Sequence, residues 1–185
     1  MTTDEYLYQT DETTRRRELV GGMVREPPAP YFSHQQLVLK IARLLCDHVE
    51  PRELGVVGVA PLDVVLDRAN NLVLQPDVLF VAANRLSIIK DQVWGAPDLV
   101  VEVHSQSTRI YDRGEKLRWY RQYGVREYWL VDLYGSSVTV MDFTGAIPVQ
   151  RETIGPDPIV SSVLPDLRIT VYEIFFEKRP GTGHW

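Results

Sequence analysis

The chain has 185 residues, a mass of 21.2 kDa and 44% hydrophobic residues, which fits one globular domain and excludes both a two-domain protein and a disordered chain. Its 20 basic and 25 acidic residues give a net charge of −5 and a pI near 5.4, which argues against a surface built wholly to hold nucleic acid. No apolar run reaches the ~18–20 residues of a membrane span, and the first residues are acidic and polar where a secretory signal would be basic and then apolar, so a cytoplasmic protein is expected. The single Cys46 excludes an internal disulfide and a Cys-rich zinc site.

The N-terminal segment is acidic. Residues 1–14 carry Asp4, Glu5, Asp11 and Glu12 and no basic residue, so we expect a mobile arm there and a single domain over residues 15–185. Three arginines, 15 to 17, then lead into a short apolar piece from Glu18 and a glycine turn. The prolines that follow at positions 27, 28 and 30 exclude regular structure up to the first long helix.

An amphipathic helix is predicted from Ser33 to about Val49. Ser33 and Gln36 have the spacing of a capping box, and apolar residues recur at helical intervals from Leu37 onward. Three runs rich in valine and leucine follow, at 55–66, 71–82 and 96–105, and each is typical of a buried strand.

A second helix is predicted over residues 112–123, with Asp112 as its N-cap and Gly124 as its stop. The runs 127–133 and 136–143 then form a hairpin, strands follow near 149–154 and 167–171, and a helical turn covers 172–176. This order of elements predicts an α/β fold with a mixed central sheet flanked by helices.

Two carboxylates stand in unexpected surroundings. Asp77 follows Pro76 within an apolar strand run, and strand alternation places Glu102 on the same face as Val100. A buried carboxylate is costly unless it is paired or bound to a metal, and two acids on adjacent strands could share Mg²⁺. The alternative is that each acid lies on an exposed strand face or forms an ion pair with an arginine.

The segments around Asp77 and Glu102, together with the segments before and after them, resemble the PD-(D/E)xK nuclease superfamily, and more closely the Uma2-type endonucleases, also called DUF820. The similarity runs through RELVGGMVREPPAP, SHQQLVLKIARLL, LQPDVLFV and the long block APDLVVEVHSQSTRIYDRGEKLRWYRQYGVREYWLVD. The resemblance implies a restriction-endonuclease-like core. It also implies that Asp77 and Glu102 are the metal ligands, with the backbone carbonyl of Val103 as a third.

The sequence departs from the superfamily motif at one position. His104 stands where the superfamily has its lysine, and in the Uma2-like pattern that lysine is displaced to the next helix, here Lys116. A long flexible ammonium side chain can reach the same point from a neighbouring helix. His104 stays a competing general base because the ordinary pKa of histidine, ~6.5, is close to neutrality, and the alternative for Lys116 is a solvated helix face.

Four further residues are candidates for the site. Glu18 and His34 could each be an additional ligand or a structural residue, and Arg109 and Arg113 could contact phosphate. The two arginines belong to a basic stretch, residues 109–126, that holds six basic and two acidic residues, a local net charge of +4.

The sequence therefore predicts a Mg²⁺-dependent endonuclease, with Mn²⁺ as a substitute ion, that acts on DNA and has weak nonspecific affinity for it. A homodimer is expected because duplex cutting needs two active sites, and the apolar hairpin 127–143 could supply the contact. The alternative is a catalytically silent nuclease-fold module that binds nucleic acid or a protein partner.

Overall fold

The computed structural model describes residues 1–8, 16–104 and 109–176. Its helical segments are α1 (Thr3–Tyr8), α2 (Phe32–Val49), η1 (Glu50–Arg52), η2 (Ala83–Ile88), α3 (Arg109–Tyr111), the π-helical turn η3 (Asp112–Lys116), α4 (Leu117–Tyr123) and α5 (Val171–Phe175). Its strands are β1 (Glu18–Val20), β2 (Met23–Arg25), β3 (Gly55–Val59), β4 (Val64–Asp67), β5 (Leu72–Leu74), β6 (Val78–Ala82), β7 (Val93–Trp94), β8 (Leu99–His104), β9 (Glu127–Asp132), β10 (Ser137–Asp142) and β11 (Val149–Ile154).

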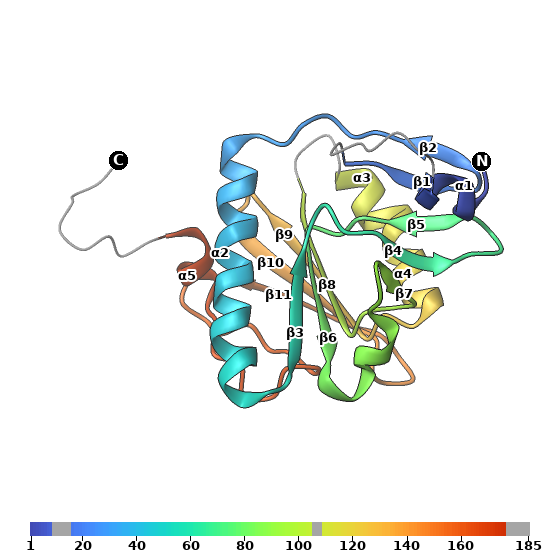
Figure 1. Cartoon of the computed structure of the whole chain (residues 1–185). Helices are drawn as coiled ribbons and strands as arrows, with labels where there is room; N and C mark the ends of the chain where they lie inside the picture. The colour runs from blue at the N-terminus through green and yellow to red at the C-terminus, as the bar shows by residue number, and fades with distance from the viewer. Residues whose placement is uncertain (9–15, 105–108, 177–185) are drawn as a thin grey trace.

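Within the described residues the strands form two mixed sheets (Figure 1). The larger has the order β11-β10-β9-β8-β6-β3, in which only the β8–β9 pair is parallel. The smaller has the order β2-β1-β5-β4-β7, in which only β4 and β7 run parallel. The predicted α/β class with a mixed sheet and flanking helices is therefore confirmed, with a second sheet added.

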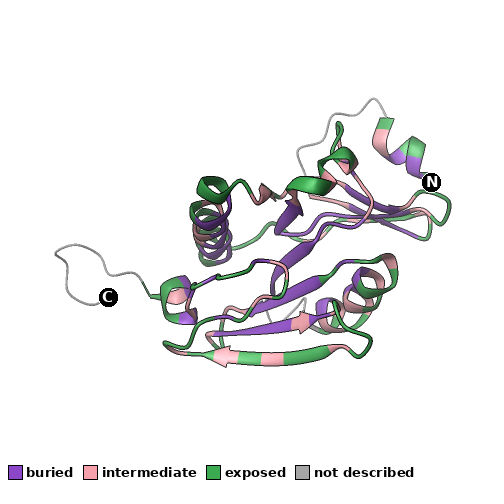
Figure 2. Ribbon diagram, turned by 90° about the horizontal axis from the view of Figure 1, so that it is seen from below, coloured by how far each residue is buried: buried purple, intermediate pink, exposed green. Residues whose placement is uncertain are grey.

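The larger sheet lies between two apolar layers. On one side Leu99, Val101 and Val103 of β8 pack with the buried face of α2 and with α5, and on the other Val100 packs with Tyr120 of α4 and with strands of the smaller sheet. Figure 2 shows this arrangement, with buried central strands and an α2 that is exposed only on its outer side. The alternation predicted for β8 is thus correct, but both of its faces are buried.

Two of the predicted strand runs each divide into a pair of strands that belong to different sheets. The first run divides into β3 and β4 around Pro61, and the second divides into β5 and β6 around Pro76. Proline has no N–H to donate to a ladder, so the pairing stops there and the chain crosses from one sheet to the other. Asp77 consequently lies where the two sheets meet.

Several local predictions differ from the structure. The helix α2 begins at Phe32 with Tyr31 as its N-cap and no side-chain cap bond, so the Ser33–Gln36 capping box is not formed. Asp112 does not cap a helix, because helical structure already begins at Arg109. Residues 167–171 form no strand beyond a single bridge at Thr170, and the helical turn begins directly after it.

The N-terminal residues are packed where a mobile arm was expected. Tyr6 of α1 is completely buried, and its hydroxyl donates to the carbonyl of Arg17 at 2.7 Å. The backbone N–H of Thr3 donates to Oδ1 of Asn71 at 2.8 Å. Burial of an aromatic ring explains why this acidic segment docks, whereas residues 9–14 of the expected arm lie outside the described residues.

None of the helices that the structure describes combines the length and the apolar character that a membrane crossing requires.

Candidate active site

The candidate site lies at the junction of the two sheets, where separate elements each contribute a charged side chain. Glu18 opens β1, Asp77 lies between β5 and β6, Glu102 is in the middle of β8, and Lys116 ends the π-helical turn η3. All four are at least 97% buried, although charged side chains rarely are unless they are paired. They are therefore held in place by one another and by the cations described below.

Asp77 is bound through both carboxylate oxygens. Its Oδ1 accepts a hydrogen bond from Nη1 of Arg16 at 2.6 Å, and its Oδ2 accepts one from the backbone N–H of Val103 at 2.7 Å and lies 3.2 Å from Nε2 of His34. Burial alone would raise the pKa of Asp77, but the His34 hydrogen bond and the charge of Arg16 outweigh it and hold the pKa below its ordinary value. Asp77 is thus an anion in the folded chain.

Glu102 faces both cations of the site. Its Oε1 accepts from Nζ of Lys116 at 2.7 Å and from the hydroxyl of Tyr120 at 2.9 Å, and its Oε2 lies 3.4 Å from Nη2 of Arg16. Complete burial raises its pKa to about 8, and the nearby charge of Asp77 adds to the rise while Lys116 opposes it. Glu102 is the acid of the site that most readily takes up a proton.

Lys116 connects two of the acids. Its Nζ lies 2.8 Å from Oε1 of Glu18 as well as 2.7 Å from Glu102, and Glu18 is further held by the hydroxyl of Tyr111 at 3.0 Å. Burial lowers the pKa of Lys116, but Glu102 and Glu18 outweigh it, so the pKa stands above its ordinary value. The side chain is therefore a charged ammonium at neutral pH.

The local charge favours binding of an additional cation. The carboxyl groups around the site outnumber its permanent cations: Glu18, Asp77, Glu102 and Asp112 against Arg16 and Lys116. The guanidinium of Arg16 already bridges Asp77 and Glu102, so a positive centre fits between these two carboxylates. No group of three His, Cys, Asp or Glu side chains within the described ranges is arranged to hold a metal, so an ion here would rely on two carboxylates and non-side-chain oxygens, which suits Mg²⁺.

The structure brings most of the predicted site residues to one small cavity of about 110 Å³. Its lining includes Glu18, His34, Asp77, Glu102, Val103 and Lys116. The two other described candidates do not line it: His104 is buried at the end of β8, and Arg113 lies half-buried on η3. The side chain of Arg109 lies outside the described part of the chain.

Four residues of the site were not predicted from the sequence as site residues. One is Asp112, expected only as a helix N-cap, whose Oδ1 lies 3.9 Å from Nζ of Lys116. Arg16 bridges the two carboxylates, while Tyr111 and Tyr120 donate to Glu18 and Glu102. The run of three arginines before β1 was a visible signal, but nothing in it indicates which arginine turns inward. The ring of Tyr120 is completely buried, and only the tertiary structure shows where its hydroxyl points.

Comparison with known proteins matches the chain to a family model, to a solved structure and to two relatives. The family model of Uma2, described as "Putative restriction endonuclease", matches residues 3–172. A crystal structure from Anabaena variabilis, described as "a putative nuclease belonging to DUF820", superposes with a TM-score of 0.78 at 19% identity and covers 95% of this chain and 97% of that one. This likeness confirms the restriction-endonuclease-like fold.

Two uncharacterized proteins of Synechocystis sp. are also similar. The protein slr1290 is 28% identical over 117 residues, which is 63% of this chain and 60% of the relative. The protein sll1609 is 24% identical over 136 residues, which is 72% of this chain and 76% of the relative. The match thus spans less than two thirds of the first relative's length.

Proposed function

The chain belongs to the Uma2 family, and from that membership we propose that it is a metal-dependent endonuclease that hydrolyses phosphodiester bonds of DNA. The observation that carries the proposal is that Asp77, Glu102 and Lys116 line one cavity although they come from three separate segments of the chain. Two carboxylates beside a buried ammonium supply what hydrolysis of a phosphodiester needs, namely ligands for a cation and a fixed positive charge.

Asp77 and Glu102 would hold the metal, Mg²⁺ or Mn²⁺ as its substitute, with the carbonyl of Val103 as a third ligand. The bridging position of Arg16 supports this assignment, because a cation already lies between the two carboxylates. A bound divalent ion lowers the pKa of a water and polarises the phosphate. Arg16 has to leave its present position for these oxygens to become available.

Lys116 would stabilise the negative charge that develops on the phosphate and orient the attacking water through its N–H groups. Because its pKa stands above the ordinary value, it cannot act as a base near neutrality. His104 is the competing residue, but it does not line the cavity that contains Asp77 and Glu102. The geometry therefore favours Lys116.

A catalytically silent module is the second candidate, and one observation favours it. Both oxygens of Asp77 and both oxygens of Glu102 already contact protein donors, as expected of an ion-pair network that only stabilises the fold. The ion pair with an arginine, which the sequence left open as an alternative for these acids, is thus present. An activity measurement separates the endonuclease from the silent module.

Plasmid nicking in Mg²⁺ or Mn²⁺ tests the proposal. We expect Asp77→Asn to lower the rate by about 100-fold or more, because it removes a ligand charge without changing the side-chain shape. Asp98→Asn is the matched control, since Asp98 is equally buried but pairs with Arg85 and Arg126 outside the site. A wild-type chain that nicks no better than Asp77→Asn refutes the enzymatic function.

The same assay decides between Lys116 and His104. We expect Lys116→Met to lose nicking and His104→Ala to retain it. The opposite result would assign the role of the motif lysine to His104.

A further inference from the structure

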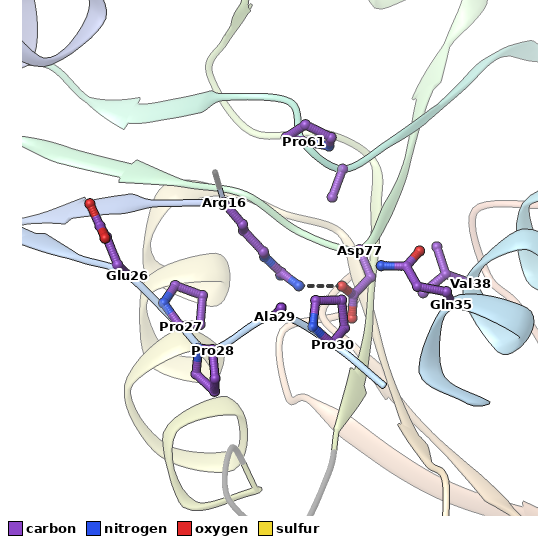
Figure 3. Close-up of a pocket in the computed structure, with 11 residues that line it drawn as sticks. Arg16, Glu26, Pro27, Pro28, Ala29, Pro30, Gln35, Val38, Pro61 and Asp77 are labelled. Atoms are coloured by element: carbon purple, nitrogen blue, oxygen red, sulfur yellow. Dashed lines mark hydrogen bonds and ion pairs between the residues drawn. The ribbon is translucent and has the colours of Figure 1, made fainter. Parts of the chain in front are cut away.

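A second, larger cavity adjoins the candidate site and extends away from Glu102 and Lys116, which do not line it. Its volume is about 550 Å³, within the range of small-molecule binding sites. It lies between the segment 26–30, the first turns of α2 and the turn at Ala60–Pro61 that joins β3 to β4 (Figure 3). We refer to it as the proline cavity, after Pro27, Pro28, Pro30 and Pro61 in its walls.

The proline cavity is continuous with the candidate site. Arg16, Asp77 and residues 27–30 line both this cavity and the smaller one that contains Glu102 and Lys116, whereas Gln35, Val38 and Pro61 line the larger cavity alone. A ligand in the proline cavity therefore lies directly against one of the two proposed metal ligands. If its phosphate reached Asp77, the rest of the molecule would extend between the proline segment and α2.

Apart from Arg16 and Asp77, the walls of the cavity combine flat apolar surfaces with two polar groups. The proline rings and Val38 are apolar, while the side chains of Gln35 and Glu26 are polar and exposed. Figure 3 shows Gln35 extending from α2 toward Asp77. An amide offers both a donor and an acceptor and a carboxylate offers acceptors, which suits the edge of a nucleobase between apolar surfaces.

The cavity is also shaped before any ligand enters. Proline fixes its own backbone angle and restricts the residue before it, so the segment 26–30 has few alternative conformations. A preformed wall lowers the entropy that is lost on binding.

We propose that the proline cavity binds one nucleotide of the substrate strand, next to the bond that is cut, with its base taken out of the stack. This inference rests on the proposed nuclease function and specifies its substrate. A base that is stacked and paired within a continuous duplex cannot place its edge between the proline segment and α2, whereas an unpaired nucleotide leaves its stack at little cost. The substrate is accordingly a single strand, or an unpaired segment within a duplex such as a negatively supercoiled plasmid contains, so the plasmid of the nicking assay is used in its supercoiled form.

Binding of fluorescein-labelled oligonucleotides, followed by fluorescence anisotropy with Ca²⁺ in place of Mg²⁺, tests the inference. We expect a single strand to bind about tenfold more tightly than a duplex of the same sequence, and Gln35→Trp, which fills the cavity, to remove about that factor. Gln36→Trp is the matched control, because Gln36 is an exposed glutamine on the same turn of α2 but does not line the cavity. Ala29→Phe fills the cavity from the proline segment and is independent of the helix, but Ala29 also lines the smaller cavity, so Gln35→Trp is the variant that reports on the proline cavity alone.

The outcomes separate this inference from the proposed function. If the wild type cuts DNA but Gln35→Trp and Ala29→Phe bind single strands as Gln36→Trp does, the cavity assignment is wrong and the nuclease function stands. If both filling variants lose binding while the wild type never cuts, the cavity binds nucleotides in a silent module. An oligonucleotide with 2-aminopurine beside the cut should brighten on binding, and unchanged fluorescence contradicts unstacking.

Discussion

At the scale of single residues, Arg16 connects the two interpretations that the sequence left open for Asp77 and Glu102, namely a shared metal ion and an ion pair with an arginine. Its guanidinium donates to Asp77 at 2.6 Å and lies 3.4 Å from Glu102, so the acids form an ion pair with an arginine and also surround a cation position. The same positive centre that stabilises these buried carboxylates has to be displaced when a metal takes its place. Arg16 therefore competes with the ion for its ligands.

We predict that Arg16→Gln raises the affinity for Mn²⁺ by about tenfold, because the ion no longer has to displace a charged side chain. Isothermal titration calorimetry measures this without requiring turnover. The metal-free variant should also unfold at a lower temperature than the wild type, since the buried Asp77 anion loses its ion pair. Arg17→Gln is the control, because Arg17 donates to the carbonyl of Tyr6 instead, and equal Mn²⁺ affinity in both variants would contradict the competition.

The raised pKa of Glu102 predicts how stability depends on pH. Between the ordinary glutamate value of 4.5 and about 8, the folded chain holds a proton that the unfolded chain has released. The contribution of Glu102 to the free energy of unfolding therefore falls as pH rises through this window. Thermal unfolding between pH 5 and 8 in the absence of divalent ions should show a steeper loss for the wild type than for Glu102→Gln, and parallel curves would show that Glu102 does not titrate there.

At the scale of elements, the crossing of two strand runs from one sheet to the other places the site. The run that forms β5 and β6 is interrupted at Pro76, so Asp77 lies between the sheets. Strand β1 pairs with β5, and this pairing places Glu18 at the same junction. From the opposite side, the π-helical turn η3 supplies Lys116. Such turns are uncommon and recur at functional sites, since the extra residue redirects a side chain.

The start of β3 depends on a glycine. Gly55 has φ of +152°, and a Cβ added there would fall on the carbonyl oxygen of Val81 in the paired strand β6. We predict that Gly55→Ala lowers the free energy of unfolding by about 3 kcal/mol or more, measured by chemical denaturation. Gly145→Ala, whose Cβ would meet only the carbonyl of Ile147 at 3.6 Å, should change it by less than about 1 kcal/mol. Similar losses in both would contradict a specific clash at β3.

At the scale of the whole molecule, the distribution of charge differs from what the linear sequence indicates. The basic stretch 109–126 is not one basic surface, because Lys116 is buried in the site and Arg126 pairs with Asp98 at 3.3 Å. The net charge of −5 includes acids of the site that a divalent ion would offset. Weak nonspecific affinity for DNA stays a prediction. Fewer basic side chains of this stretch can contact phosphate than its local net charge of +4 suggests.

A homodimer also stays a prediction, but the hairpin proposed as its contact is not available. The strands β9 and β10 are interior strands of the larger sheet, and Trp129, Val131, Val138 and Val140 of this hairpin are buried in the chain's own core. We expect light scattering after size exclusion to give twice the 21.2 kDa chain mass at micromolar concentration. A mass of one chain would contradict the dimer.

The sequence by itself determined the fold class, the helix α2, the strands β8 to β11 and the candidates Asp77, Glu102 and Lys116. Periodicity and turn residues are local signals, and they specify these elements without knowledge of their neighbours. The motif that carries the resemblance is also local, since its residues follow one another along the chain.

Only the tertiary structure decided which side chains meet. The division of two strand runs between sheets, the docking of α1 through Tyr6, the inward turn of Arg16 and the hydroxyl contact of Tyr120 all depend on contacts between segments distant in the chain. A buried charge selects its partner by distance and desolvation, and both are properties of the packed molecule. For that reason the acids could be found from the sequence, whereas the arginine that lies between them could not.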